Sequence, residues 1–302
     1  MLPTLKHSKI DELDALTITS PDYTATVLLQ GAQLIHFSTR TEPDNWLWVS
    51  DKAEYKVGDS VRGGVPICWP VFGQFEANPQ QVKDSFANCR FDLKQHGFAR
   101  NQIFDVNLFN PLHVNRRLEH FSSLTLSLPE LEDFHPKLGL QVKFLFSSYS
   151  FSIALTTTNH SDETVHFSQA LHTYLPTGDI EQTTIKGLDQ VTYSDALDNW
   201  ITKIQQGEVT FSEGVDRIYH AAPALIVVEP RASLPHIESK GSNSTVIWNP
   251  WHTKAHEISQ FGAEDYKKML CVETANAHLD TVSLTPGESH ELSVEIMHLA
   301  FF

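Results

Sequence analysis

The chain has 302 residues, 41% of them apolar, and a formal net charge of −15. That length and apolar content allow a large buried core, in one all-β domain as readily as in two smaller ones. The negative charge, without any run of lysine or arginine, argues against nucleic acid or an anionic membrane as a partner. An anionic ligand would need a local cluster of arginines, whose planar donors match phosphate oxygens.

The N-terminal segment mixes single apolar residues with charged ones and has no apolar core of a signal peptide. The longest apolar runs are far too short to cross a bilayer. The three cysteines, Cys68, Cys89 and Cys271, are odd in number and widely spaced, which is typical of reduced thiols. We therefore expect a cytoplasmic protein without a membrane span.

Strand-like alternation dominates the chain, whereas helical periodicity is scarce and is best in the short segment Thr253 to Phe261. No alternation of strands with long helices supports a parallel sheet. We therefore predict an all-β antiparallel sandwich and, in the absence of linkers and repeats, a single domain over residues 1–302. The predicted strands include Leu124 to Leu128, Phe151 to Leu155, Thr164 to Leu175, Ala224 to Glu229, Thr245 to Trp248, Met269 to Asn276 and Leu292 to Ile296.

The stretch from Val57 to Arg100 is rich in glycine and proline placed among aromatic residues, and long ordered loops of this kind usually carry function. Trp69 and Phe72 could offer ring faces to a sugar. The alternative is a turn beside a buried aromatic cluster.

Arg62 and Arg100 are two of only eight arginines, and both lie beside glycine turns. His96 precedes one of these turns and can point a polar group from the same loop as Arg100. These three residues could bind an anion, although an arginine stacked on an aromatic ring is the competing interpretation.

His172 and Glu273 lie in predicted strands about a hundred residues apart, and a histidine with a carboxylate can form an acid and base pair. If 164–175 is one strand, His172 projects from its more polar face. For each residue a structural role is the alternative: a hydrogen-bonded core histidine, and a glutamate in a salt bridge. Two such groups on rigid strands could hold a substrate between them.

Three further features bear on ligand binding. Asp216 stands beside Arg217 and could orient hydroxyl groups, or the two could form a surface ion pair. Trp248 offers an aromatic surface at a strand end, suited to a sugar but equally to an edge plug. His252 and His256 have helical metal-ligand spacing without an evident third ligand, so we predict no metal site.

Signatures of nucleotide, dinucleotide and serine-nucleophile sites are absent from the sequence, and we predict no cofactor. Seven segments in order do resemble a known family: Arg-Gly-Gly-Val-Pro-Ile-Cys-Trp-Pro, His-Gly-Phe-Ala-Arg, Leu-His-Thr-Tyr, Gly-Asp-Ile, Asp-Arg-Ile-Tyr, Trp-Asn-Pro-Trp and Cys-Val-Glu-Thr-Ala-Asn. Together they are similar to the hexose-6-phosphate mutarotases, a branch of the aldose 1-epimerase superfamily. The resemblance runs from about Arg62 to Asn276.

The resemblance implies a β-supersandwich of the galactose mutarotase type, in a monomeric or loosely associated enzyme that interconverts α and β anomers of a hexose 6-phosphate. It implies His172 as general acid and Glu273 as general base. His96, Asp216, Arg62 and Arg100 match its substrate-binding residues, to which we add Trp248. The alternatives are a mutarotase of unphosphorylated aldoses, with structural arginines, and a non-catalytic carbohydrate-binding module.

Ordinary pKa values of about 4.3 for glutamate and 6.5 for histidine predict a carboxylate that is ready to accept a proton near neutrality. The imidazolium needs support, which a nearby carboxylate or the phosphate of the ligand could supply.

Overall fold

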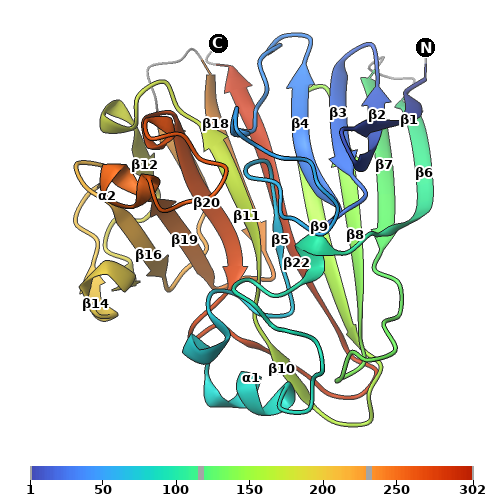
Figure 1. Cartoon of the computed structure of the whole chain (residues 1–302). Coiled ribbons are helices and arrows are strands. Elements are labelled where there is room, and N and C mark those ends of the chain that lie inside the picture. The colour runs from blue at the N-terminus through green and yellow to red at the C-terminus, as the bar shows by residue number, and fades with distance from the viewer. Residues whose placement is uncertain (1, 115–118, 229–232, 301–302) are drawn as a thin grey trace.

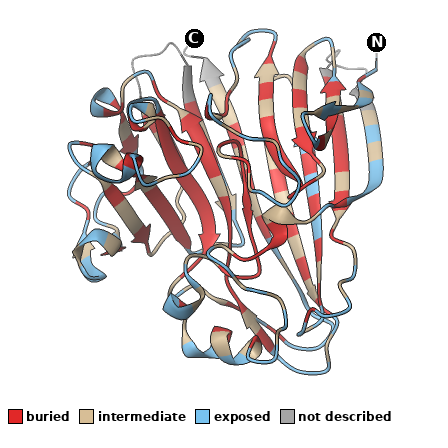
Figure 2. Cartoon of the chain, in the orientation of Figure 1, coloured by how far each residue is buried: buried red, intermediate tan, exposed pale blue. Residues whose placement is uncertain are grey.

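The structure is a computed structural model that describes residues 2–114, 119–228 and 233–300. It is built mainly of three antiparallel sheets (Figure 1). Side chains that alternate along the strands fill the space between the sheets, so that red buried bands cross the strands while the loops are mostly exposed (Figure 2). The predicted all-β antiparallel class is confirmed.

The largest sheet has nine strands, and the two other large sheets pack against it. Along β8 the residues alternate regularly between buried and non-buried, which shows one face on the core and one in solvent. In order, the strands are β15 (Val209–Thr210), β12 (Thr184–Lys186), β17 (Leu225–Val228), β18 (Ser233–Lys240), β22 (Ser289–Ala300), β9 (Ser150–Asn159), β8 (Leu138–Phe146), β7 (Glu119–Ser127) and β6 (Asp105–Val114).

A four-stranded sheet covers one part of the nine-stranded sheet. Tyr23 Oη donates to Ser122 Oγ at 2.8 Å, and the Phe37 ring lies 5.8 Å from that of Phe146 and 5.1 Å from that of Phe151. Aromatic contacts therefore join the two layers. The strands are β1 (Thr4–Ile10), β2 (Leu13–Thr19), β3 (Tyr23–Leu28) and β4 (Gln33–Thr39).

A seven-stranded sheet covers another part of the nine-stranded sheet, next to the four-stranded sheet. A bridge joins Leu34 of β4 to Val65, which lies two residues before the last strand of the seven-stranded sheet. The fully buried Trp69 follows its last strand and donates from Nε1 to Thr157 Oγ1 of β9 at 3.0 Å. The strands in order are β14 (Ile201–Ile204), β13 (Thr192–Asp195), β16 (Val215–Tyr219), β19 (Ser244–Asn249), β20 (Met269–Asn276), β11 (Gln169–Pro176) and β5 (Ile67–Cys68).

Strand β20 differs from β8 because all of its residues are buried. One face packs on the core, and loops and short helices cover the other. The short elements are α1 (Gln80–Ser85), α2 (Trp251–Ala255) and the 3-10 helices η1 (Phe75–Ala77), η2 (Ala99–Asn101), η3 (Ile180–Gln182), η4 (Ala196–Asp198) and η5 (Asp265–Lys268). Within the described residues, no helix is both long and apolar enough to cross a membrane.

Two predictions about elements were wrong. The segment 164–175 is not one strand: β10 (Val165–Phe167) pairs with β21 (Val282–Leu284), and β11 pairs with β20. Between them Ser168 Oγ accepts from the Phe72 N–H at 2.8 Å and donates to Asn78 Oδ1, so its side chain is bound to the segment that follows Trp69. The predicted helix over 253–261 is also misplaced, because α2 begins at Trp251 and ends at Ala255. The other predicted strands lie in β7, β9, β17, β19, β20 and β22, with Glu229 outside the described residues.

Candidate active site

Two rows of residues cross four neighbouring strands of the seven-stranded sheet. In the order β11, β20, β19, β16, the members of the first row are His172, Glu273, Val246 and Ile218, and those of the second are Tyr174, Cys271, Trp248 and Asp216. Residues two apart on a strand share a face, so both rows face the same way. All of them except Cys271 line a cleft of about 490 Å³.

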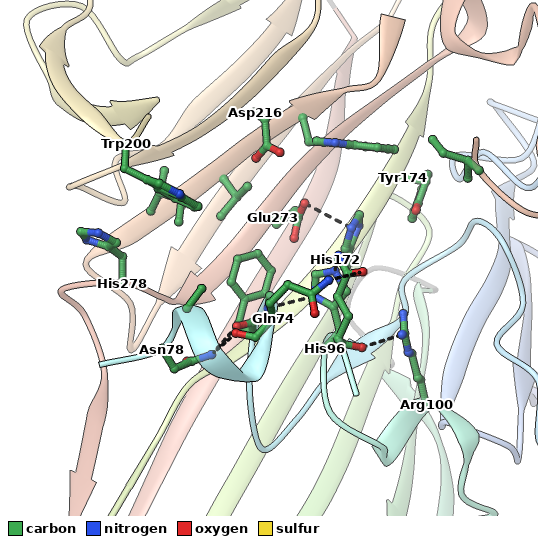
Figure 3. A pocket seen from close by; sticks show the side chains of 18 of the residues that line it. Gln74, Asn78, His96, Arg100, His172, Tyr174, Trp200, Asp216, Glu273 and His278 are labelled. Carbon is green, nitrogen blue, oxygen red and sulfur yellow. Dashed lines mark hydrogen bonds and ion pairs between the residues drawn. The ribbon is translucent and has the colours of Figure 1, made fainter. Parts of the chain in front are cut away.

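His172 and Glu273 are direct neighbours in the first row, and their side chains meet over the sheet (Figure 3). His172 Nε2 lies 3.3 Å from Glu273 Oε1. The glutamate is only 2% exposed, and the His172 side chain is 12% exposed. The structure thus brings together two residues that lie a hundred positions apart in the sequence.

Burial acts on both groups against their charged forms. It raises the pKa of Glu273 well above its usual range, and the nearby Asp216 raises it further. Burial lowers the pKa of His172 to about 3, and the positive charges of Arg62 and Arg100 also lower it. Burial therefore favours the neutral form of each group more than exposure to water would. The expectation of a ready carboxylate took the pKa of an exposed glutamate and left this burial out.

Aromatic rings fix the orientation of the His172 imidazole. It stacks on Tyr174 at 4.8 Å with an angle of 11° between the rings. Trp248 meets it edge-on at 6.1 Å, and His96 does so at 5.6 Å. Rotation of the imidazole would break these contacts, so its Nε2 stays directed at Glu273.

Arg62 reaches the cleft from the segment that precedes β5. Its Nη1 donates to Tyr174 Oη at 3.1 Å, and its Nε donates to the Ser259 carbonyl at 3.3 Å. Gly64 allows the chain to follow this path, since its φ is +65° and a Cβ there would collide with the Leu34 carbonyl oxygen. The guanidinium is therefore held beside the ring on which His172 stacks.

His96 and Arg100 come from one loop, which is attached to the segment after Trp69 by a bridge between Trp69 and Gly97. His96 Nδ1 accepts the Gly73 N–H at 3.2 Å, and the Gln95 side-chain nitrogen lies 3.3 Å from His96 Nε2. Burial lowers the pKa of His96 well below its usual value, and His172, Arg100 and Arg62 lower it further. Arg100 Nη2 donates to the Gln95 carbonyl at 2.7 Å.

Four residues that line the cleft each carry a buried polar atom that has no hydrogen-bond partner among the described residues. They are Arg100 Nε, His172 Nδ1, Glu273 Oε2 and His278 Nδ1. An unpaired buried polar group costs about 1–3 kcal/mol, and most native groups of this kind are paired. Their concentration in one cleft indicates that a ligand or water supplies their partners.

Comparison with known proteins agrees with this geometry. The sequence profile of the aldose 1-epimerase family matches residues 14–297. The chain belongs to the aldose 1-epimerase family. Relatives in this family include a protein from Cenchrus ciliaris, 30% identical over 87% of this chain and 78% of its own length. Another, from Escherichia coli, is 30% identical over 97% of this chain and 93% of its own. Both are provisionally named glucose-6-phosphate 1-epimerase.

The fold of this epimerase also has counterparts among solved structures. A protein from Salmonella typhimurium, provisionally named a mutarotase, superposes with a TM-score of 0.83 at 24% identity, over 98% of this chain and 94% of its own. That likeness shows the same fold, which is the galactose mutarotase type that the motifs implied.

The structure places every predicted site residue on the cleft of the epimerase, since His172, Glu273, Arg62, His96, Arg100, Asp216 and Trp248 all line it. Trp69 does not: it is fully buried in the core, so its proposed contact with a sugar was wrong. Asp216 and Arg217 form no ion pair of the predicted kind, because neighbours on a strand point to opposite faces. Arg217 lies over the Tyr193 ring at 4.8 Å.

Trp200 and His278 are among the cleft residues that sequence reasoning missed. Each stands in a turn and has a positive φ, +60° and +57°, which is uncommon for bulky residues. No periodic pattern marks them in the sequence. In the part of the chain that the structure describes, no group of three His, Cys, Asp or Glu side chains could hold a metal ion.

Proposed function

We propose that this epimerase interconverts the α and β anomers of a hexose 6-phosphate, with D-glucose 6-phosphate as the preferred sugar. The observation that carries the proposal is the position of two arginines beside the acid and base pair. Arg62 and Arg100 line the same cleft as His172 and both lower its pKa. In a protein with a net charge of −15, such a local positive site is what an anionic sugar needs.

In the proposed reaction Glu273 removes the proton from the C1 hydroxyl while His172 delivers a proton to the ring oxygen. The bond between C1 and the ring oxygen breaks, and an open-chain aldehyde forms. After rotation about the bond between C1 and C2, the hydroxyl of C5 adds to the other face of the aldehyde. The two residues then exchange protons with the sugar in reverse, so no cofactor is consumed.

The protonation of the pair fits this reaction when a phosphate is bound. With both groups neutral, Glu273 carries a proton, and its transfer to His172 produces the required base and acid together. The arginines oppose this transfer because they disfavour an imidazolium. A phosphate at Arg62 and Arg100 offsets their charge and so favours the imidazolium. Phosphate binding thereby activates His172 as well as holding the substrate.

The remaining cleft residues have roles in binding. His96 donates from Nε2 to an oxygen of the sugar phosphate. Asp216 and Trp248 lie opposite each other on β16 and β19, where the acid binds ring hydroxyls and the indole contacts a ring face. We also propose that the chain acts as a single-domain cytoplasmic monomer. The uninterrupted family match over residues 14–297 and three free cysteines support this.

The test is NMR exchange spectroscopy of the anomers of glucose 6-phosphate, free glucose and galactose with wild type and with Arg100→Gln. Loss of a charged hydrogen bond costs about 1.5–3 kcal/mol, so we expect kcat/KM for the phosphorylated sugar to fall roughly 10- to 150-fold. Arg90→Gln is the control, because its side chain is 80% exposed.

Faster exchange of free sugars than of the phosphorylated one, unchanged in Arg100→Gln, would contradict the phosphate assignment. The protein would then be a mutarotase of unphosphorylated aldoses.

A further inference from the structure

The cleft extends beyond the residues that the proposed reaction uses. Past Glu273 the first row continues with Val246 and Ile218, on β19 and β16. Neighbouring strands lie about 4.8 Å apart, so this apolar floor reaches roughly 10 Å from Glu273. Arg100 stands on the other side of His172 (Figure 3), and Arg62 binds Tyr174 on the same strand as His172. Val246 and Ile218 are only 2% and 4% exposed, so they form the closed bottom of this part of the cleft.

Trp200 and His278 form a wall at this far end of the cleft (Figure 3). Their rings stack at 5.8 Å with an angle of 14°. One face of the indole is thus against His278, yet Trp200 remains 46% exposed. The backbone N–H of Trp200 donates to the Asp195 carbonyl at 2.8 Å, and this bond holds the turn that presents the indole. A large exposed aromatic side chain beside an apolar floor is a surface for stacking a ring.

His278 adds a polar atom to this wall. Its Nδ1 is among the four unpaired buried polar atoms of the cleft and is the one farthest from the arginines in Figure 3. Behind it, His220 lies 5.9 Å away and its Nε2 is 3.0 Å from Ser194 Oγ. Burial lowers the pKa of His278, so a neutral imidazole is available for a hydrogen bond with an uncharged ligand group.

We propose that Val246, Ile218, Trp200 and His278 form a second compartment, which binds a ring linked through O1 to a hexose 6-phosphate. The ligand class is the glycosides of hexose 6-phosphates, including disaccharides whose phosphorylated hexose is linked through O1. This rests on the proposed function, which places the phosphate at the arginines and C1 at Glu273. A substituent on O1 then points away from the arginines, over the apolar floor.

Such a ligand inhibits and does not react. Ring opening requires loss of a proton from the C1 hydroxyl, and a glycoside carries carbon in its place. It would occupy the arginines and both compartments, but it offers Glu273 no C1 hydroxyl proton to remove. The second compartment therefore makes the enzyme sensitive to phosphorylated glycosides in addition to its substrate.

The test compares the methyl and phenyl β-D-glucopyranoside 6-phosphates, and their α anomers, by titration calorimetry. The methyl group is too small to reach Trp200, so it serves as the internal reference. We expect wild type to bind one phenyl anomer about 3- to 10-fold more tightly than its methyl counterpart, the size of one aromatic contact. Trp200→Ala should abolish this preference, whereas Trp200→Phe should keep most of it. Ile201→Ala is the control, since Ile201 is the next residue and is 52% exposed.

Equal affinity for methyl and phenyl ligands in wild type, a preference that persists in Trp200→Ala, or no phenyl binding at all would overturn the compartment. Failure of the proposed function has a different signature. If no phosphate binds at the arginines, the phosphorylated and unphosphorylated glycosides will bind equally, in wild type and in Arg100→Gln. The phenyl preference can still be measured on the unphosphorylated pair.

Discussion

Replacing Glu273 by glutamine should remove nearly all catalysis and leave the fold intact. The side chain is 2% exposed, and its Oε1 lies 3.3 Å from His172 Nε2. Glutamine keeps the volume and the hydrogen-bonding shape but cannot accept the C1 proton. A positioned proton transfer contributes about 10²- to 10⁴-fold, so we expect kcat to fall by that factor. This corresponds to about 2.7–5.5 kcal/mol in the activation barrier.

The same variant should gain stability relative to wild type as the pH rises. Burial raises the folded pKa of Glu273, whereas the unfolded value is about 4.3. Between these two values the folded state binds more protons than the unfolded state, so wild type loses stability as the pH rises through this window. Glutamine has no such titration. Each unit of pKa elevation corresponds to about 1.4 kcal/mol, so the relative gain in stability between pH 4 and 7 measures how far burial raises the folded pKa of Glu273.

Two measurements check these expectations: anomer exchange by NMR at pH 7, and denaturant unfolding of both proteins between pH 4 and 7. Glu264→Gln is the control, because its side chain is 67% exposed. A variant that retains kcat would refute the role of Glu273 as base. A variant that loses stability relative to wild type with rising pH would refute the burial argument.

Three further outcomes follow from the same contacts. His172→Asn should flatten the dependence of stability on pH between about pH 3 and 6.5. In this range wild type loses stability on acidification, because its unfolded state binds a proton that the folded state does not. Unfolding curves at several pH values test this, and an unchanged slope of stability against pH would contradict it. Tyr174→Phe removes the Oη that Arg62 binds but keeps the ring on which His172 stacks. KM for glucose 6-phosphate should therefore rise roughly fivefold, with kcat nearly constant. A loss confined to kcat would contradict a role of this contact in substrate binding. Gly97→Ala should lower the free energy of unfolding by more than about 1 kcal/mol relative to Gly207→Ala. Both glycines have a φ of +69°, but only a Cβ at Gly97 would collide with backbone atoms, those of Trp69 and Pro70. Equal losses for the two variants in denaturant titrations would show that this collision has no effect on stability.

Much of the fold and of the site follows from local sequence. Period-two alternation located the strands β7, β9 and β22, because a half-buried strand must alternate its side chains. A glutamate inside a strand such as β20 asks for a special explanation, since burying an unpaired charge is costly. The residue types and their strand positions therefore suffice to identify His172 and Glu273 as a candidate acid and base pair.

Other features depend on packing over long distances. The register that sets His172 opposite Glu273 joins segments a hundred residues apart, and a slip of one residue would turn every side chain to the other face. Local pattern could not tell that Trp69 is core while Trp200 borders the cleft, because both are aromatic residues in irregular segments. Nor could it locate the break at Ser168, where the chain passes from one sheet to another.

The sequence by itself determined the residue types available for proton transfer and the all-β class, since both depend on local chemistry and on the spacing of apolar side chains. Only the tertiary structure decided their protonation and the extent of the cleft. The pKa values of Glu273 and His172 depend on how completely the surrounding strands exclude water and on how near Asp216, Arg62 and Arg100 lie. Those distances are set by segments that meet only in the folded chain.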